Sequence, residues 1–141
     1  MSEAQVKPLN WTPQPGIGYT VRRRPDGGMH YVFTDVSPKT LEHWRAFALE
    51  HLLDSDRLTR NLYDLRQIEV LPEYAINYAL EVSNDPSTRN IRLAVVVASE
   101  VVRNAVETIA ALTHPGGLEL GIFTDIDEAE AWLSRPLTLL D

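Results

Sequence analysis

The chain has 141 residues, of which 44% are hydrophobic, and it carries a formal net charge of −7 at pH 7. This length fits one domain with a buried core, and the negative charge disfavours binding to nucleic acid or to anionic membranes. The sequence contains no cysteine, which excludes disulfides, thiolate metal sites and cysteine nucleophiles. Because no apolar run reaches the ~20 residues that span a bilayer, we expect a cytoplasmic protein without a membrane span.

Both ends of the chain differ in composition from its middle. Residues 1–17 contain Pro8, Pro13 and Pro15, and this proline density predicts a Pro-rich arm with Trp11 as its apolar anchor. Residues 18–135 are predicted to form the folded domain, and residues 136–141 an apolar C-terminal tail. An exposed tryptophan and an exposed apolar tail are costly in water, so we expect a homo-oligomer that covers them.

The first predicted element is a β-hairpin over residues 19–36. The Pro25-Asp26-Gly27-Gly28 turn separates two β-prone runs. Strand alternation places Arg23 on one face, and Arg22 and Arg24 on the other. This basic cluster has two interpretations, a contact with an anionic partner or protection of an edge strand against pairing.

Helices and strands then alternate to the end of the chain. Ser37 is the predicted N-cap of the first helix, which continues with Pro38, and Pro72 and Asn84 bracket the second helix. The predicted helices are 37–53, 71–84, 100–113 and 127–135, and the predicted strands are 61–70, 91–99 and 118–125. The strand at 91–99 is continuously apolar, as in sheets covered on both faces. The order predicts an α/β fold with a mixed, mostly parallel sheet, an N-terminal β-hairpin and flanking helices.

The C-terminal half resembles the SpoIIAA-like family, which is related to the STAS domain. The resemblance rests on "RLAVVVAS", on "LELGIFTDIDEAEAWL" with Phe123 and Trp132, and on "LYDLR" at 62–66, which is similar to the central strand of the family. It covers most of residues 18–133 and implies a SpoIIAA-like, STAS-like fold. These motifs are largely apolar, so they mark the fold and specify little function.

The resemblance also implies a function that the sequence contradicts at one point. The best understood members of the family are anti-sigma-factor antagonists, with a phosphorylatable serine at the start of the helix after the central strand. Leu71 and Pro72 stand at that junction here, with no serine or threonine beside them. Phosphorylation needs a hydroxyl, so we predict no phosphorylation site.

The stretch "GIFTDIDEAEAWL" places Asp125, Asp127, Glu128 and Glu130 within six positions. The pairs Asp125–Glu128 and Asp127–Glu130 each have the spacing of a capping box at a helix start. The stretch lacks the glycine turn of a calcium loop, and His43 and His51 are too far apart on one helix to share a metal. We therefore predict neither a metal site nor a cofactor. Ser99, which follows a buried strand without the glycines of a nucleophile elbow, is predicted to be an N-cap.

Parallel α/β sheets bind ligands beyond the carboxyl ends of their strands. That edge gathers Asp64 and Arg66, Glu73 and Tyr74, Ser99 and Glu100, and Thr124 and Asp125, of which Asp64, Arg66, Glu73 and Tyr74 are our candidate ligand- or partner-binding residues. Our preferred hypothesis is a non-enzymatic binding module for a protein or an apolar small molecule. The alternatives are a small hydrolase or transferase with a carboxylate and arginine site at this edge, and a regulator like the anti-sigma-factor antagonists.

Overall fold

The computed structural model describes residues 14–25, 28–52, 59–85, 91–113 and 118–135. Five strands and four helices occur in these residues: β1 (Tyr19–Arg23), β2 (Met29–Phe33), α1 (Pro38–Leu52), β3 (Thr59–Asp64), α2 (Glu73–Ser83), β4 (Ile91–Val96), α3 (Glu100–Leu112), β5 (Leu118–Phe123) and α4 (Ile126–Leu133). The order confirms the predicted hairpin followed by alternating helices and strands.

The strands form one sheet in the order β1-β2-β3-β4-β5. β1 and β2 are antiparallel, with Val21 opposite Tyr31, and the remaining neighbours are parallel. The predicted mixed, mostly parallel sheet is therefore confirmed. Because each parallel strand returns through a helix, the carboxyl ends of β2 to β5 meet at one edge.

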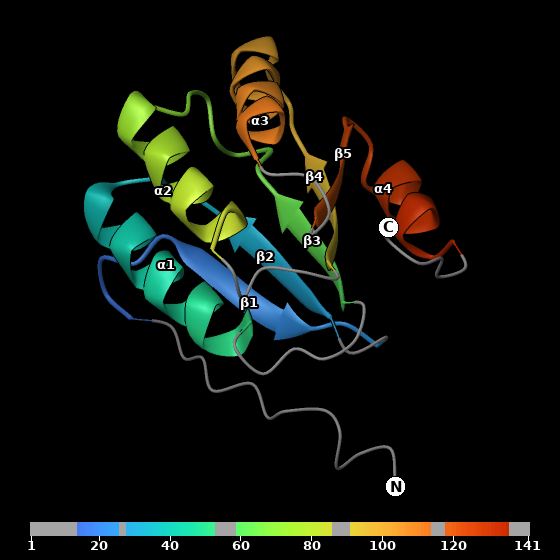
Figure 1. Cartoon of the computed structure of the whole chain (residues 1–141), viewed down its shortest axis with the longest axis horizontal. Helices are drawn as coiled ribbons and strands as arrows, with labels where there is room; N and C mark the ends of the chain where they lie inside the picture. Colours follow the sequence, from blue (N-terminus) through green and yellow to red (C-terminus); the bar gives the residue numbers. More distant parts are fainter. Residues whose placement is uncertain (1–13, 26–27, 53–58, 86–90, 114–117, 136–141) are drawn as a thin grey trace, which may run out of the picture.

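Helices cover the two faces of the sheet unequally. Figure 1 shows α1, α2 and α3 over one face and α4 over the other. The larger core lies beneath α1 to α3 and includes Tyr31, Trp44 and Val95. A smaller core joins α4 to the sheet through Leu62, Ala94, Val96, Ala129 and Leu133. β4 contributes to both cores, which explains why all of its residues except Arg92 are apolar.

Local side chains define where three helices begin. Ser37 Oγ accepts a hydrogen bond from the Thr40 amide at 3.3 Å, and Ser99 Oγ accepts one from the Val102 amide at 3.1 Å. Asp125 Oδ1 accepts from the Asp127 amide at 2.9 Å. The predicted caps at Ser37 and Ser99 are confirmed, and the acidic stretch begins α4 at Asp125, the first of its two candidate pairs.

The strand predicted at 61–70 differs most from the structure in extent. The strand expected at 61–70 occupies Thr59–Asp64, because the chain turns after Asp64, where the Ile68 amide donates to the Leu65 carbonyl at 3.0 Å. The turn expected at Pro25–Gly28 includes residues 26–27, which lie outside the described residues. So do Trp11 and the tail at 136–141, and the arm, domain and tail boundaries remain predictions. In the described part of the chain, no helix is long and apolar enough to cross a membrane.

Candidate functional site

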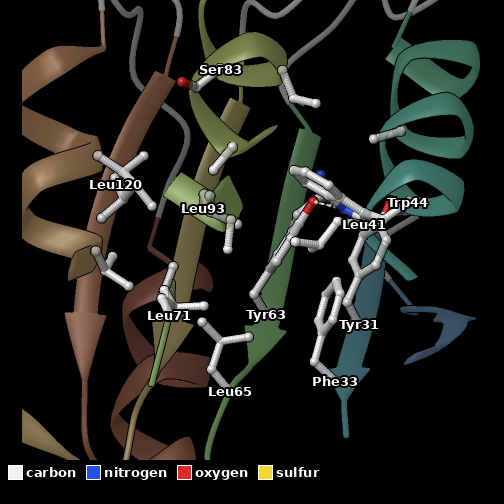
Figure 2. A pocket seen from close by; sticks show the side chains of 18 of the residues that line it. Tyr31, Phe33, Leu41, Trp44, Tyr63, Leu65, Leu71, Ser83, Leu93 and Leu120 are labelled. Carbon is white, nitrogen blue, oxygen red and sulfur yellow. Dashed lines mark hydrogen bonds between the residues drawn. The ribbon is translucent and has the colours of Figure 1, made fainter. Parts of the chain in front are cut away.

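A cavity of about 130 Å³ lies between α2 and the sheet, flanked by α1 and α3 (Figure 2). Strands β2 to β5 form its floor through inward-facing residues at every second position, such as Tyr31 and Phe33 on β2 and Leu93 and Val95 on β4. This spacing follows from strand alternation, which directs these side chains to the face beneath α1 to α3.

The wall beside α1 is aromatic. Tyr31 and Tyr63 stack with ring centroids 4.4 Å apart, and the Trp44 ring stands at 90° to that of Tyr63. Figure 2 shows these rings, with Phe33, on one side of the cavity. Because β2 and β3 are adjacent and parallel, their aromatic residues fall directly opposite each other, as Tyr31 and Tyr63 do in the register. These contacts make this wall rigid.

The opposite wall is aliphatic. Leu65, Leu71, Leu93 and Leu120 lie there in Figure 2. Helix α2 covers the cavity with two small residues, Ala75 and Ala79, together with Val82 and Ser83. A helix that presents alanine to a sheet leaves more space beneath it than one that presents leucine, so these two positions help to create the cavity.

Few polar atoms reach this cavity. The Trp44 indole N–H donates to the Tyr63 hydroxyl at 3.1 Å, and the Met29 amide donates to Asn61 Oδ1 at 3.0 Å. Ser83 Oγ pairs with Thr113 Oγ1 at 2.9 Å. Burial raises the pKa of the Tyr63 hydroxyl well above its usual range, so Tyr63 keeps its proton at neutral pH. The described residues that line the cavity include no aspartate, glutamate, lysine, arginine or histidine.

Asp64 and Arg66 meet each other at the carboxyl edge of the sheet. The Arg66 guanidinium donates to both oxygens of Asp64, at 2.9 and 2.8 Å, and the Arg66 amide donates to Oδ1 at 3.0 Å. Burial of Asp64 opposes its ionisation, but the hydrogen bonds and the charge of Arg66 outweigh burial, and the pKa of Asp64 is lowered. The pair thus forms a closed ion pair at the turn after β3.

In the described part of the chain, the other candidate residues form no hydrogen bond or ion pair with Asp64 or Arg66. The Tyr74 hydroxyl donates to the Val36 carbonyl at 2.9 Å, which ties α2 to the segment before α1. Glu73 is exposed in the first turn of α2 and Glu100 in the first turn of α3. Thr124 is also exposed. Among the described residues, no hydrogen bond or ion pair joins Asp64 or Arg66 to Glu73 or Tyr74, and a role for these four in binding remains a prediction.

The side chains of the three consecutive arginines, Arg22 to Arg24, lie in different surroundings. Arg24 is 8% exposed, and its guanidinium donates to both carboxylate oxygens of Glu130 on α4, at 2.9 and 3.0 Å. Arg22 is exposed and lies 3.5 Å from His30 Nδ1, while Arg23 is half-buried on the opposite face. Alternation along β1 is confirmed, and it prevents the three charges from forming one patch. Glu130 of the acidic stretch forms an ion pair with Arg24, and spacing along the sequence does not reveal this contact.

The acidic stretch and the histidines do not assemble in the described part of the chain. No group of three histidine, aspartate or glutamate side chains there is placed to hold a metal ion. His30 is buried, and its Nε2 has no hydrogen-bond partner among the described residues. Burial first, and then the charge of Arg22, lower its pKa. His43 Nδ1 instead pairs with the Tyr19 hydroxyl at 2.8 Å.

The amino-acid sequence does not reveal this cavity. Its lining residues were visible only as parts of apolar faces, and the empty space between them depends on how far α2 stands from the sheet. The alanines at positions 75 and 79 are a weak signal, since the same pattern occurs where a helix packs closely.

A comparison with solved structures supports the fold. No protein-family model and no curated protein matches the chain. A crystal structure of an uncharacterised protein of the DUF3478 family from Shewanella loihica PV-4, described as having a SpoIIAA-like fold, is similar with a TM-score of 0.63 and 16% identity. The match covers 87% of this chain and 99% of that one. The chain therefore has a SpoIIAA-like fold, as its sequence motifs predicted.

Proposed function

We propose that this protein is a non-enzymatic binding module that holds an apolar small molecule in the cavity between α2 and the sheet. The observation that carries the proposal is a cavity of about 130 Å³ with an almost wholly apolar lining within the larger core. Apolar pockets with a few fixed polar groups are the usual form of small-molecule sites.

The energetic cost of the cavity supports this function. Protein interiors contain few voids larger than a water molecule. At about 24 cal/mol per Å³ for an enclosed cavity, a cavity of about 130 Å³ that is partly open to solvent lowers stability by at most about 3 kcal/mol while it is empty. A cost of this size is a large fraction of the total stability of a small domain. A ligand that fills the space recovers it, which gives the alanines of α2 a functional reason.

The geometry favours binding over bond-breaking chemistry. A hydrolase or transferase at the carboxyl edge requires a carboxylate or arginine free to meet substrate, and an acid with a raised pKa. Asp64 and Arg66 are instead bonded to each other, and the pKa of Asp64 is lowered. No serine or threonine stands beside Leu71 and Pro72 in the sequence at the start of helix α2, which argues against regulation through a phosphorylated serine at that position.

Thermal unfolding with a small apolar probe tests the proposal. Toluene at ten times its dissociation constant stabilises a protein that binds it by about 1.4 kcal/mol. For a domain of this size we expect the Tm to rise by about 3–5 °C. Loss of the toluene effect in Ala79→Leu, whose added carbons enter the cavity, locates the binding.

Ala111→Leu serves as the matched control, because it makes the same alanine-to-leucine change at an exposed position of α3. It should bind toluene like the unmodified protein. A Tm that does not change at any toluene concentration, or an equal rise in Ala79→Leu, contradicts binding in this cavity.

A further inference from the structure

We infer that the cavity selects neutral ring-sized molecules that carry one hydrogen-bond acceptor, such as a carbonyl oxygen. This inference rests on the proposed function and specifies the chemistry of its ligand. Three observations carry it: the size of the cavity, the lack of charge in its lining, and two hydrogen-bond donors on β3.

Size limits the ligand first. A cavity of about 130 Å³ is comparable to the ~150 Å³ cavities that hold benzene. A single six-membered ring with a small substituent therefore fits, whereas drug-sized ligands occupy pockets of about 300 Å³ or more. The flat Tyr63 and Tyr31 rings on one wall suit the face of such a ring.

Charge limits it next. Within the part of the chain that the structure describes, the lining contains no lysine, arginine or histidine to pair with an anion, and no aspartate or glutamate to pair with a cation. Burying an unpaired charge in an apolar space is strongly unfavourable. A carboxylate, a phosphate or an amine is therefore excluded from the cavity in its ionised form.

Tyr63 supplies one donor. Its hydroxyl oxygen accepts from the Trp44 indole at 3.1 Å, which fixes the oxygen and leaves the hydroxyl proton for another acceptor. The Tyr31 hydroxyl, which donates to Met29 Sδ at 3.8 Å, is also a hydrogen-bond neighbour of the Tyr63 hydroxyl, and no other described residue accepts from that proton. Figure 2 shows the Tyr63 hydroxyl and Trp44 together at the rim of the aromatic wall.

Asn61 supplies the second donor, two positions earlier on the same face of β3. It lines the cavity and is 4% exposed. Its Oδ1 accepts from the Met29 amide at 3.0 Å, and this bond fixes which end of the amide is oxygen. Nδ2 has no hydrogen-bond partner in the described parts of the chain. The Asn61 amide, and beside it the Tyr63 hydroxyl, give a ligand with an acceptor an advantage that a hydrocarbon lacks.

Ser83 is the natural contrast. It also lines the cavity, but its hydroxyl is bonded to Thr113 Oγ1 at 2.9 Å. Ser83→Ala should therefore leave the preference for an acceptor unchanged, whereas Tyr63→Phe removes one of the two donors.

The test compares cyclohexanone with methylenecyclohexane, which have the same shape and differ in C=O against C=CH2. In a cavity without donors, the ratio of their affinities equals the ratio of their water-to-hydrocarbon partition coefficients. We expect cyclohexanone to bind at least about tenfold more tightly than that ratio allows, the contribution of one hydrogen bond. Cyclohexanecarboxylate at pH 7 should not bind.

The variants and NMR assign the donor. If Tyr63 is the donor, the advantage of the ketone falls about tenfold in Tyr63→Phe and persists in Ser83→Ala. If Asn61 is the donor, the advantage persists in Tyr63→Phe, and the side-chain amide signals of Asn61 shift with the ketone and not with the alkene. Binding of the alkene shows in each case that the variant is folded.

The other results overturn the inference. Affinities that follow the partition coefficients in the unmodified protein contradict the role of both donors, while alkene binding still upholds the proposed function. Binding of the carboxylate as tight as that of the ketone contradicts the preference for neutral ligands. If neither cyclohexanone nor methylenecyclohexane binds, the proposed function and this inference both fail.

Discussion

Filling the cavity should stabilise the protein when no ligand is present. Ala79 lies on the face of α2 that covers the cavity, and Ala79→Leu adds three carbon atoms toward that space. Alanine and leucine are both strong helix formers, so the helix itself should change little. The effect of the substitution is therefore a direct measure of the empty volume.

The magnitude follows from the cavity volume. Each buried CH2 contributes about 0.8 kcal/mol, so three added carbons contribute up to about 2.4 kcal/mol. This is below the roughly 3 kcal/mol that a fully enclosed empty space of about 130 Å³ would cost at 24 cal/mol per Å³. Imperfect fit reduces the gain, and we expect the free energy of unfolding to rise by about 1–2 kcal/mol.

Urea unfolding followed by circular dichroism measures this change, with the slope of the transition checked for constancy. Ala111→Leu, the exposed control on α3, should change stability by less than about 0.5 kcal/mol. A loss of 1 kcal/mol or more in Ala79→Leu would show that the space under α2 is already filled by packed side chains, and the reasoning about the cavity would be wrong.

Four further predictions concern other parts of the molecule. Burial and the charge of Arg22 lower the pKa of His30, which also faces Arg24, Asp64 and Glu130. At acidic pH the unfolded chain therefore binds more protons at His30 than the folded chain does. The free energy of unfolding should then fall as the pH drops through about 6.5. His30→Leu should remove that part of the pH dependence between pH 8 and 5, and an unchanged slope in denaturant titrations would contradict the assignment. Arg92 is 2% exposed and donates to Glu119 and to the Arg135 carbonyl. Without Arg92, Glu119 still accepts from Arg135 and the Arg135 carbonyl still accepts from Arg60. Arg92→Met should therefore cost about 1–3 kcal/mol in urea unfolding, not the 3–5 kcal/mol of a fully broken buried pair. A Cβ on Gly18 would overlap the Asp35 carboxylate, which is held by the Ser37 amide and the Thr40 hydroxyl; Gly18→Ala should lower stability by about 1–3 kcal/mol, and Asp35→Ala in the same chain should restore part of it. The predicted homo-oligomer should appear in light scattering as a mass above 15.9 kDa that falls when residues 136–141 are removed, and a monomer at every concentration contradicts it.

The sequence by itself determined the order of the elements and the fold. Helix starts at Ser37, Ser99 and Asp125 are local, because each depends on one side-chain oxygen and an amide two or three residues away. The alternation of β1 and the apolar run of β4 likewise depend on the period of the backbone. These signals were sufficient to predict a mostly parallel sheet with an antiparallel hairpin, since every crossover in such a sheet follows from the order of strands and helices.

Only the tertiary structure decided which residues meet. The pairing of Arg24 with Glu130 joins residues 106 positions apart, and spacing along the chain carries no information about such a contact. Asp64 and Arg66 were identified as neighbours, but their mutual bonding followed from the turn after β3. The cavity is the clearest case: Asn61 and Tyr63 have the pattern of ordinary buried strand residues, and the space before them exists because α2, with its two alanines, stands away from the sheet. A void is a property of the distance between packed elements, and no single segment encodes it.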